Sequence, residues 1–172
     1  MVFFSYSLGI DFRSRNLIII LLRKFLGKIR MVDYRIYPVW SEGQKDVQEA
    51  QWISLISTFL SKNQVKTDRV CISIPREKAL VRFLRLPAAT KENLRKVIEY
   101  EAPKLTPFDK EEFFFDYQIV SEDAEWLNLI VAFVKKEDLN PYLNLLKKVG
   151  IHPVFVEVSP VSALNLFHYH QD

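Results

Sequence analysis

The segment at residues 70–118 constrains the fold more than any other part of the chain. Two strand-like runs, residues 69–74 and 79–86, are separated by a turn-forming segment that begins with Pro75. Pro87 ends the second run, because proline has no N–H to donate to a neighbouring strand. A helix and a further strand follow, so the segment predicts the order strand, strand, helix, strand.

The helix predicted within this segment has signals at both ends. Thr90 is placed to cap its N-terminus. Pro107 stops the helix, because the residue before a proline, Thr106, is biased toward extended backbone. The strand that follows is predicted at residues 113–120. The helix has an apolar stripe at helical spacing, which consists of Leu94, Val97 and Ile98.

The N-terminal part predicts an antiparallel meander followed by a helix. Strands are expected at residues 6–12, 16–22 and 28–39, with a turn at Gly27. The run at residues 17–22 is apolar at every position, so we expect that strand to be covered on both faces, at least in the assembled protein. Asp46 is expected to cap the helix, whose apolar side would contain Val47, Ala50, Ile53, Ile56, Phe59 and Leu60.

The C-terminal part predicts strand, helix, strand and the start of a helix. The strands are expected at residues 127–134 and 153–158. The first helix would be capped by Asp138, with Pro141 in its first turn and Gly150 just beyond its end. Pro160 begins the second helix.

Composition indicates a folded globular protein. The chain has 172 residues, enough for one solid core or two small ones, and 49% of them are hydrophobic. The apolar run at residues 17–22, which no other run exceeds, is far short of the roughly 20 residues that cross a bilayer. Charged residues, the first of them Asp11, interrupt the apolar start before a secretory signal is complete. We therefore expect a cytoplasmic protein without an anchor of its own.

Charge is distributed unevenly along the chain. Residues 1–45 contain eight Lys or Arg and three Asp or Glu, whereas residues 91–125 contain five and ten. Such asymmetry can orient a protein toward an anionic membrane surface or an acidic partner, although two oppositely charged solvated faces are the simpler interpretation. The basic residues never form a block, which argues against nucleic-acid binding.

Several segments resemble a known family. The chain contains, in order, LGID, IPREKALVRFLRLP, EYEAPKLTPF, FFFDYQIV and LIVAFVKKEDLNPYLNLLKKVGIHPVFVEVSPVSALNLF. Their order and spacing resemble the cytoplasmic PilM family of type IV pilus assembly. They are at least as similar to the cytoplasmic part of type II secretion protein L, in which an LTPF-like phrase follows the same helix. Nearly the whole chain is covered by this resemblance.

The resemblance implies an α/β fold: a ribonuclease H-like (actin-like) half with an inserted small α/β subdomain. Residues 1–77 and 151–172 would form the ribonuclease H-like subdomain. Residues 78–150 would form the inserted subdomain, with the order strand, helix, strand, strand, helix. The strand at residues 153–158 should then pair beside residues 6–12 or 70–74.

Actin-like ATPases hold phosphates in tight hairpins, where only glycine or small residues let backbone N–H groups approach the anion. In the resembling family the first hairpin reads like GIDIGSSS. Asp11 and Ser14 match it and are the cofactor-binding candidates if a nucleotide binds, but Arg13 and Arg15 replace a glycine and a small residue. The chain also ends at Asp172, before the second hairpin would follow. We therefore expect no cofactor here, and ATP only in a longer form.

The sequence predicts no catalytic or metal site. No Cys or carboxylate cluster accompanies the three histidines. Glu99 and Glu101 are two residues apart on a helix and cannot share one face for acid–base work. Cys71 lies in an apolar strand and is expected to be buried and inert. We expect a protein that is not an enzyme.

Two features suit protein binding. The strand at residues 79–86 carries Phe83 and Arg85 on one face and Arg82 on the other, which often marks the rim of a contact surface, although charge also protects solvated edge strands. Consecutive phenylalanines at residues 113–115 must point to alternate faces, so at least one leaves the local core. We predict a groove between the two lobes whose partner-binding residues are Arg82, Phe83, Arg85, Phe113 and Phe115.

With the resemblance, these features predict a cytoplasmic assembly or scaffold protein of a type IV pilus or type II secretion machine. It would dock the tail of an inner-membrane subunit, or the motor ATPase, and reach the membrane only through that partner; self-association is a further option. The alternative is the N-terminal part of an actin-like ATP-binding protein. An RNA-binding ferredoxin-like module fits the order of the middle elements, but the aromatic-glycine signature for stacking bases is missing.

Overall fold

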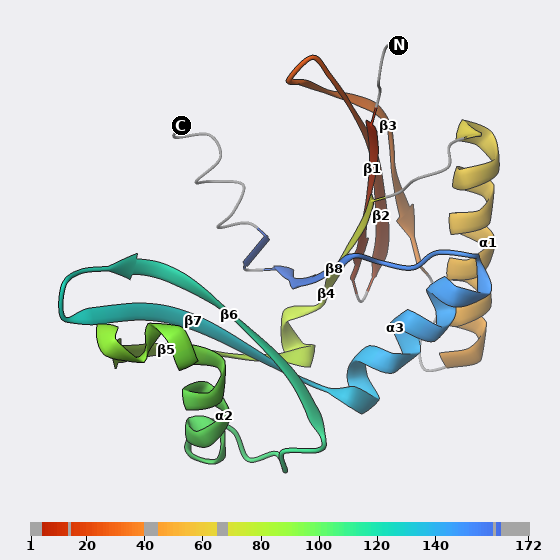
Figure 1. Cartoon of the computed structure of the whole chain (residues 1–172). Helices are drawn as coiled ribbons and strands as arrows, with labels where there is room; N and C mark the ends of the chain where they lie inside the picture. Colours follow the sequence, from red (N-terminus) through yellow and green to blue (C-terminus); the bar gives the residue numbers. More distant parts are fainter. Residues whose placement is uncertain (1–4, 14, 40–44, 65–68, 160, 163–172) are drawn as a thin grey trace. The chain divides into compact units, whose positions relative to one another are not determined.

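The structure is a computed structural model that describes residues 5–13, 15–39, 45–64, 69–159 and 161–162. Figure 1 follows the chain from the N-terminus to the C-terminus. The fold divides into two compact units. Unit 1 consists of Met1–Pro75 and Pro141–Asp172, and unit 2 consists of Arg76–Asn140.

Unit 1 is built on one five-stranded sheet with the order β3-β2-β1-β4-β8. The first three strands form an antiparallel meander, and β4 and β8 continue the sheet in parallel with β1. This is the strand arrangement of the ribonuclease H-like fold, and the predicted pairing of the return strand beside residues 70–74 is confirmed. The strands are β1 (Ser5–Phe12), β2 (Asn16–Phe25), β3 (Lys28–Pro38), β4 (Arg69–Ile74) and β8 (Phe155–Val158).

The turn predicted at Gly27 is a two-residue hairpin loop. Leu26 and Gly27 join β2 to β3 with φ angles of 45° and 76°. Positive φ at both loop residues is the feature of a type I′ turn, whose twist matches that of the flanking strands.

Helix α1 (Lys45–Asn63) covers one face of this sheet. The β2 side chains alternate: one set is buried and the other set, Ile18, Ile20 and Leu22, is half-buried. Coverage of both faces in the assembled protein stays a prediction. The buried set is Leu17, Ile19 and Leu21, and α1 buries Trp52, Ile56 and Phe59.

The apolar side of α1 differs from the prediction. Val47 and Ala50 are exposed, whereas Trp52 is buried. At 100° per residue, Trp52, Ile56 and Phe59 share one stripe, and the exposed pair lies more than a quarter turn away from it. The helix begins at Lys45, so the predicted capping position lies one residue inside it.

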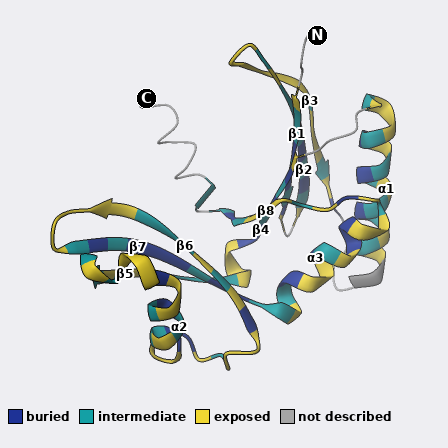
Figure 2. Ribbon diagram, in the orientation of Figure 1, coloured by how far each residue is buried: buried dark blue, intermediate teal, exposed yellow. Residues whose placement is uncertain are grey.

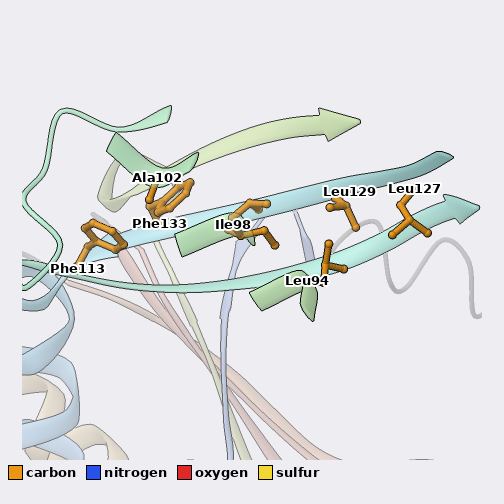
Figure 3. Close-up of a cluster of buried hydrophobic side chains, with 8 residues drawn as sticks. Leu94, Ile98, Ala102, Phe113, Leu127, Leu129 and Phe133 are labelled. Atoms are coloured by element: carbon orange, nitrogen blue, oxygen red, sulfur yellow. The ribbon is translucent and has the colours of Figure 1, made fainter. Parts of the chain in front are cut away.

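Unit 2 is a three-stranded antiparallel sheet with the order β5-β7-β6, covered on one face by α2 (Leu94–Leu105). Its strands are β5 (Ala79–Pro87), β6 (Phe113–Glu122) and β7 (Trp126–Lys135), and two short 3₁₀ helices lie at Arg76–Lys78 and Ala88–Asn93. Figure 3 shows the buried cluster between α2 and the sheet. It consists of Leu94, Ile98, Ala102, Phe113, Leu127, Leu129, Val131 and Phe133.

The end of α2 is as predicted, but its start is different. Thr106 has extended backbone angles and follows the last helical residue. The predicted cap Thr90 lies instead in the second 3₁₀ helix, where its hydroxyl donates to the Pro87 carbonyl at 2.7 Å. A short 3₁₀ segment thus precedes α2, and Asn93 stands at the N-cap position without a side-chain hydrogen bond.

Helix α3 (Lys136–Lys148) begins two residues before its predicted cap. Asp138 lies in its first turn and accepts from Lys78 Nζ at 2.6 Å, and Pro141 lies inside the helix. From Pro141 onward the helix belongs to unit 1, whereas the resemblance places all of it in the inserted segment. The reason is Tyr142, whose ring lies 4.9 Å from that of Phe12 and 5.9 Å from that of Trp52.

The architecture confirms the predicted fold class, an α/β fold with a ribonuclease H-like half and a second, small α/β unit. Figure 2 shows that burial is concentrated where helices face the two sheets.

Candidate functional site

The end of β1 carries the predicted nucleotide-binding residues. Asp11 is followed by Arg13, whose Nε donates to Asp11 Oδ2 at 2.7 Å. The other carboxylate oxygen, Oδ1, is buried and has no hydrogen-bond partner among the described residues. The backbone N–H of Arg13 closes the turn by donating to the Asn16 carbonyl at 3.0 Å. Ser14 lies outside the described residues.

These residues differ from the glycine-rich phosphate hairpin that the resemblance implies. In this chain Arg13 donates to one of the two oxygens of the Asp11 carboxylate. No glycine stands between Phe12 and Asn16 to let backbone N–H groups approach an anion closely.

The described residues contain no group of three or more His, Cys, Asp or Glu that could hold a metal ion. Cys71 is half-buried, and burial first, then the nearby Glu157 carboxylate, raises the pKa of its thiol above the usual value. A raised pKa keeps the thiol protonated at neutral pH, and the thiolate is the nucleophilic form. The environment of Cys71 thus favours an inert thiol.

The predicted binding strand β5 lies at an edge of the unit 2 sheet and is hydrogen-bonded only to β7 among the strands of that sheet. Phe83 stands at its centre with 78% of its surface exposed. It lies opposite Ile130, on the face away from α2, because its neighbour Leu84 packs against the α2 cluster. The exposed Phe83 side chain offers an apolar contact, and the open edge of β5 offers backbone N–H and C=O groups for pairing.

The two arginines beside Phe83 have different contacts. Arg82 is exposed, and its Nε donates to the Leu105 carbonyl at 3.2 Å, so it also caps the C-terminal end of α2. Arg85 is exposed and lies over the Trp126 ring, with its guanidinium carbon 4.4 Å from the ring centre. A guanidinium stacked on an aromatic ring keeps its charge and loses little mobility on binding.

Arg85 also lies near the turn between β6 and β7. The Glu125 and Trp126 backbone N–H groups donate to Asp123 Oδ1 at 2.9 and 2.8 Å. The bond from Glu125 first, then that from Trp126, holds the pKa of the Asp123 carboxyl below its usual value, and the nearby Arg85 charge acts in the same direction.

The structure places Phe113 and Phe115 mainly in the core. The Phe113 ring lies 5.3 Å and the Phe115 ring 6.0 Å from that of Phe133, within or against the α2 cluster. Phe114 points the other way and is 44% exposed, as the alternation along the strand requires. Both core residues still line a small pocket of about 180 Å³, together with Arg95, Glu99, Lys110 and Phe114.

The five predicted partner-binding residues do not form one patch within unit 2. β5 and β6 are opposite edges of the sheet, with β7 between them, about 10 Å apart at the usual strand spacing. Phe83 and Arg85 face away from α2, whereas Phe113 and Phe115 face toward it. An extended segment that adds to this sheet can therefore pair with only one of the two sets.

Two contributors were missed from the sequence. Trp126 supports Arg85, and Phe114 is the outward-facing member of its trio. Trp126 follows the turn signal at Asp123, and the pairing of β5 with β7 puts it opposite Pro87 at the end of β5. Because α2 and β6 lie between β5 and β7 in the chain, the turn signal alone does not reveal the contact between Arg85 and Trp126.

Among the helices that the structure describes, none is long and apolar enough to span a membrane.

Comparison with solved structures shows two clear similarities. The first is to a PilM-PilN type IV pilus biogenesis complex, with 18% identity and a TM-score of 0.77 over 92% of this chain and 49% of that one. The second is to the cytoplasmic domain of EpsL, an inner membrane component of the type II secretion system of Vibrio cholerae. It has 14% identity and a TM-score of 0.57 over 89% of this chain and 57% of that one. The chain thus spans about half the length of these two structures.

Among curated proteins there is no significant sequence match. The family model described as type IV pilus assembly protein PilM matches residues 9–168, which is most of the chain. The match agrees with the sheet order and with the two structural similarities. The resemblance inferred from the sequence segments is confirmed, and the chain belongs to the family of type IV pilus assembly protein PilM.

Proposed function

We propose that this protein is a non-enzymatic assembly protein that docks an extended cytoplasmic tail of an inner-membrane partner along β5. The observation that carries this proposal is Phe83, which is 78% exposed at the middle of an edge strand and stands between two exposed arginines. The similarity to a PilM-PilN complex supports it, because that structure is an assembly of two proteins.

The docking mode is strand addition. A tail that pairs with β5 satisfies its backbone groups on the open edge, and its alternate side chains meet the side chains of β5. Phe83 and Arg85 lie on one face and Arg82 on the other, so an apolar side chain flanked by carboxylates suits the strand best. The protein would thereby work in the cytoplasm, held at the inner membrane through its partner.

The test is co-purification with the inner-membrane partner of the same pilus or secretion system. Phe83→Ala and Arg85→Glu are each expected to weaken retention about tenfold or more, because a buried aromatic or arginine anchor can contribute about 2 kcal/mol. Arg82→Glu, which we expect to weaken retention similarly, is a less specific probe, because Arg82 also holds the Leu105 carbonyl at the end of α2.

Phe114→Ala is the matched control. It removes another exposed phenylalanine from the same unit, on the opposite edge of the sheet. If the Phe83→Ala and Arg85→Glu variants keep an unchanged far-UV spectrum and retain the partner at wild-type strength, β5 is not the docking strand. A loss confined to Phe114→Ala would move the site to β6, the strand of the predicted binding residues Phe113 and Phe115.

A further inference from the structure

The β2–β3 hairpin ends in a strongly basic tip. The hairpin tip (residues 23–30) contains Arg23, Lys24, Lys28 and Arg30, and no Asp or Glu occurs between it and Asp33. Among the residues that the structure describes, Lys24, Lys28 and Arg30 take part in no ion pair. Figure 2 shows this loop as exposed.

The strand register gathers the positive charge on one face. Arg23 lies directly opposite Arg30, and Phe25 lies directly opposite Lys28. Because successive residues of a strand alternate between faces, these two cross-strand pairs share one face of the hairpin.

An apolar side chain stands at the apex of this basic hairpin. Leu26 is 83% exposed and has a φ of 45°, a conformation that favours Asn or Gly. Leucine at this position neither favours the turn conformation nor packs into the core. Ile29, which lies opposite Lys24, is also exposed, so apolar side chains stand beside cations in the hairpin tip.

A pocket opens beside the hairpin tip. It has a volume of about 380 Å³ and is lined by Arg23, Phe25, Leu26, Lys28 and Arg30. Cations and apolar side chains therefore border the same concave space, which matches a ligand that carries a negative group beside a hydrocarbon chain.

We propose that the hairpin tip binds the surface of an anionic lipid bilayer, with Leu26 inserted among the headgroups and the cations at the level of the phosphates. Basic residues next to an anionic leaflet are attracted electrostatically, and exposed apolar side chains gain by leaving water. Long Lys and Arg side chains can hold their charge at the headgroups while their stems cover apolar surface.

A bilayer explains both parts of the hairpin tip. A soluble anion would use the cations but gain nothing from Leu26, which is 83% exposed, whereas a bilayer offers both anionic headgroups and an apolar interior. The family resemblance implies membrane contact only through a partner, and the hairpin adds a direct contact. This contact does not depend on docking at β5, because the hairpin lies in unit 1 and β5 in unit 2.

The test is flotation of the purified 172-residue chain with lipid vesicles, without any partner protein. The protein is expected to float with vesicles of equal parts phosphatidylcholine and phosphatidylglycerol, and not with phosphatidylcholine alone. Added salt should weaken the binding, because it screens exposed charges. The Lys28→Gln/Arg30→Gln double variant should lose about thirtyfold in partition, from the contribution of each cation near an anionic leaflet.

Leu26→Asn separates the bilayer from other anions. Asn suits the positive φ of a type I′ turn, so the hairpin remains folded, while partition should fall about tenfold with the apolar contact removed. The control is Arg76→Gln/Lys96→Gln, which removes the same charge from exposed positions in unit 2 and should bind as wild type.

Four results would overturn the proposal. They are equal binding to neutral vesicles, wild-type binding by the Lys28→Gln/Arg30→Gln variant, an equal loss in the control variant, and wild-type binding by Leu26→Asn. Wild-type binding by Leu26→Asn, together with release of the protein from the vesicles by inorganic phosphate, would assign the hairpin tip to a soluble anion.

Discussion

At Gly9 the packing of the unit 1 sheet leaves no room for a side chain. A Cβ built on this residue would lie 2.9 Å from Ile20 Cγ2, on the strand that pairs with β1. The family segment Leu8-Gly9-Ile10-Asp11 therefore needs its glycine for a close cross-strand contact. This packing contact accounts for the glycine without a bound phosphate.

Gly9→Ala is expected to destabilise the protein by about 1–3 kcal/mol, the usual range for overpacking a core. Urea unfolding of Gly9→Ala, Ile20→Ala and the double variant would measure the coupling between the two residues. The double variant should be less destabilised than the sum of the single changes, because the truncated Ile20 side chain makes room for the new methyl group. Simple additivity would show that the contact is not the cause.

Arg13 argues against nucleotide binding at the same end of β1. Titration calorimetry of this chain with Mg-ATP is expected to show no micromolar binding, because Arg13 holds Asp11 Oδ2 and the hairpin lacks glycine. Arg13→Gly should not restore binding by itself, because Arg15 still stands where a small residue is needed. Micromolar affinity of the unchanged chain would contradict this account of the hairpin.

At the scale of elements, we expect the stability of the β6–β7 turn to depend on pH. The pKa of Asp123 is lowered by the hydrogen bonds that it accepts from Glu125 and then Trp126. A lowered folded pKa means that the stabilisation is fully present above the unfolded pKa, about 3.9, and is lost as pH falls through the folded value.

Asp123→Ala is accordingly expected to lower the urea midpoint at neutral pH. The difference from wild type should shrink as the pH falls below the folded pKa of Asp123, because protonation removes the same bonds in the wild type. Glu122→Ala, which removes a neighbouring carboxylate together with its ion pair to Lys91, is the control for loss of a carboxylate near this turn. A difference that is independent of pH would exclude titration of Asp123 as its origin.

At the scale of the whole molecule, the chain divides into two compact units, and their cores are separate sets of residues. Ile98 of α2 is fully buried in the cluster between this helix and the sheet. Ile98→Ala is therefore expected to cost about 2–5 kcal/mol of stability. Hydrogen exchange should show the loss of protection at residues 76–140 and little change in α1 and β2. An equal loss in both units would show that they unfold as one cooperative body.

The sequence by itself determined the order of the strands and helices and most of their ends. Proline and glycine carry this information locally: Pro107 sets the extended Thr106 that ends α2, and Gly27 sets the β2–β3 turn. The alternation of β5 also places Phe83 and Leu84 on opposite faces, and the structure has the first outward and the second inward. Fold and family could therefore be read from one chain.

Only the tertiary structure decided which sides of these elements are covered. Trp52 and not Val47 became the buried residue of α1, because the sheet selects one stripe of a helix that is apolar on more than one side. The second half of α3 belongs to unit 1, where Tyr142 packs against Phe12. The predicted binding residues separated onto opposite edges and faces because β7 lies between β5 and β6. Residues that are distant in the sequence determine which face of a helix or strand is covered. The spacing of residues along a single element does not reveal that face.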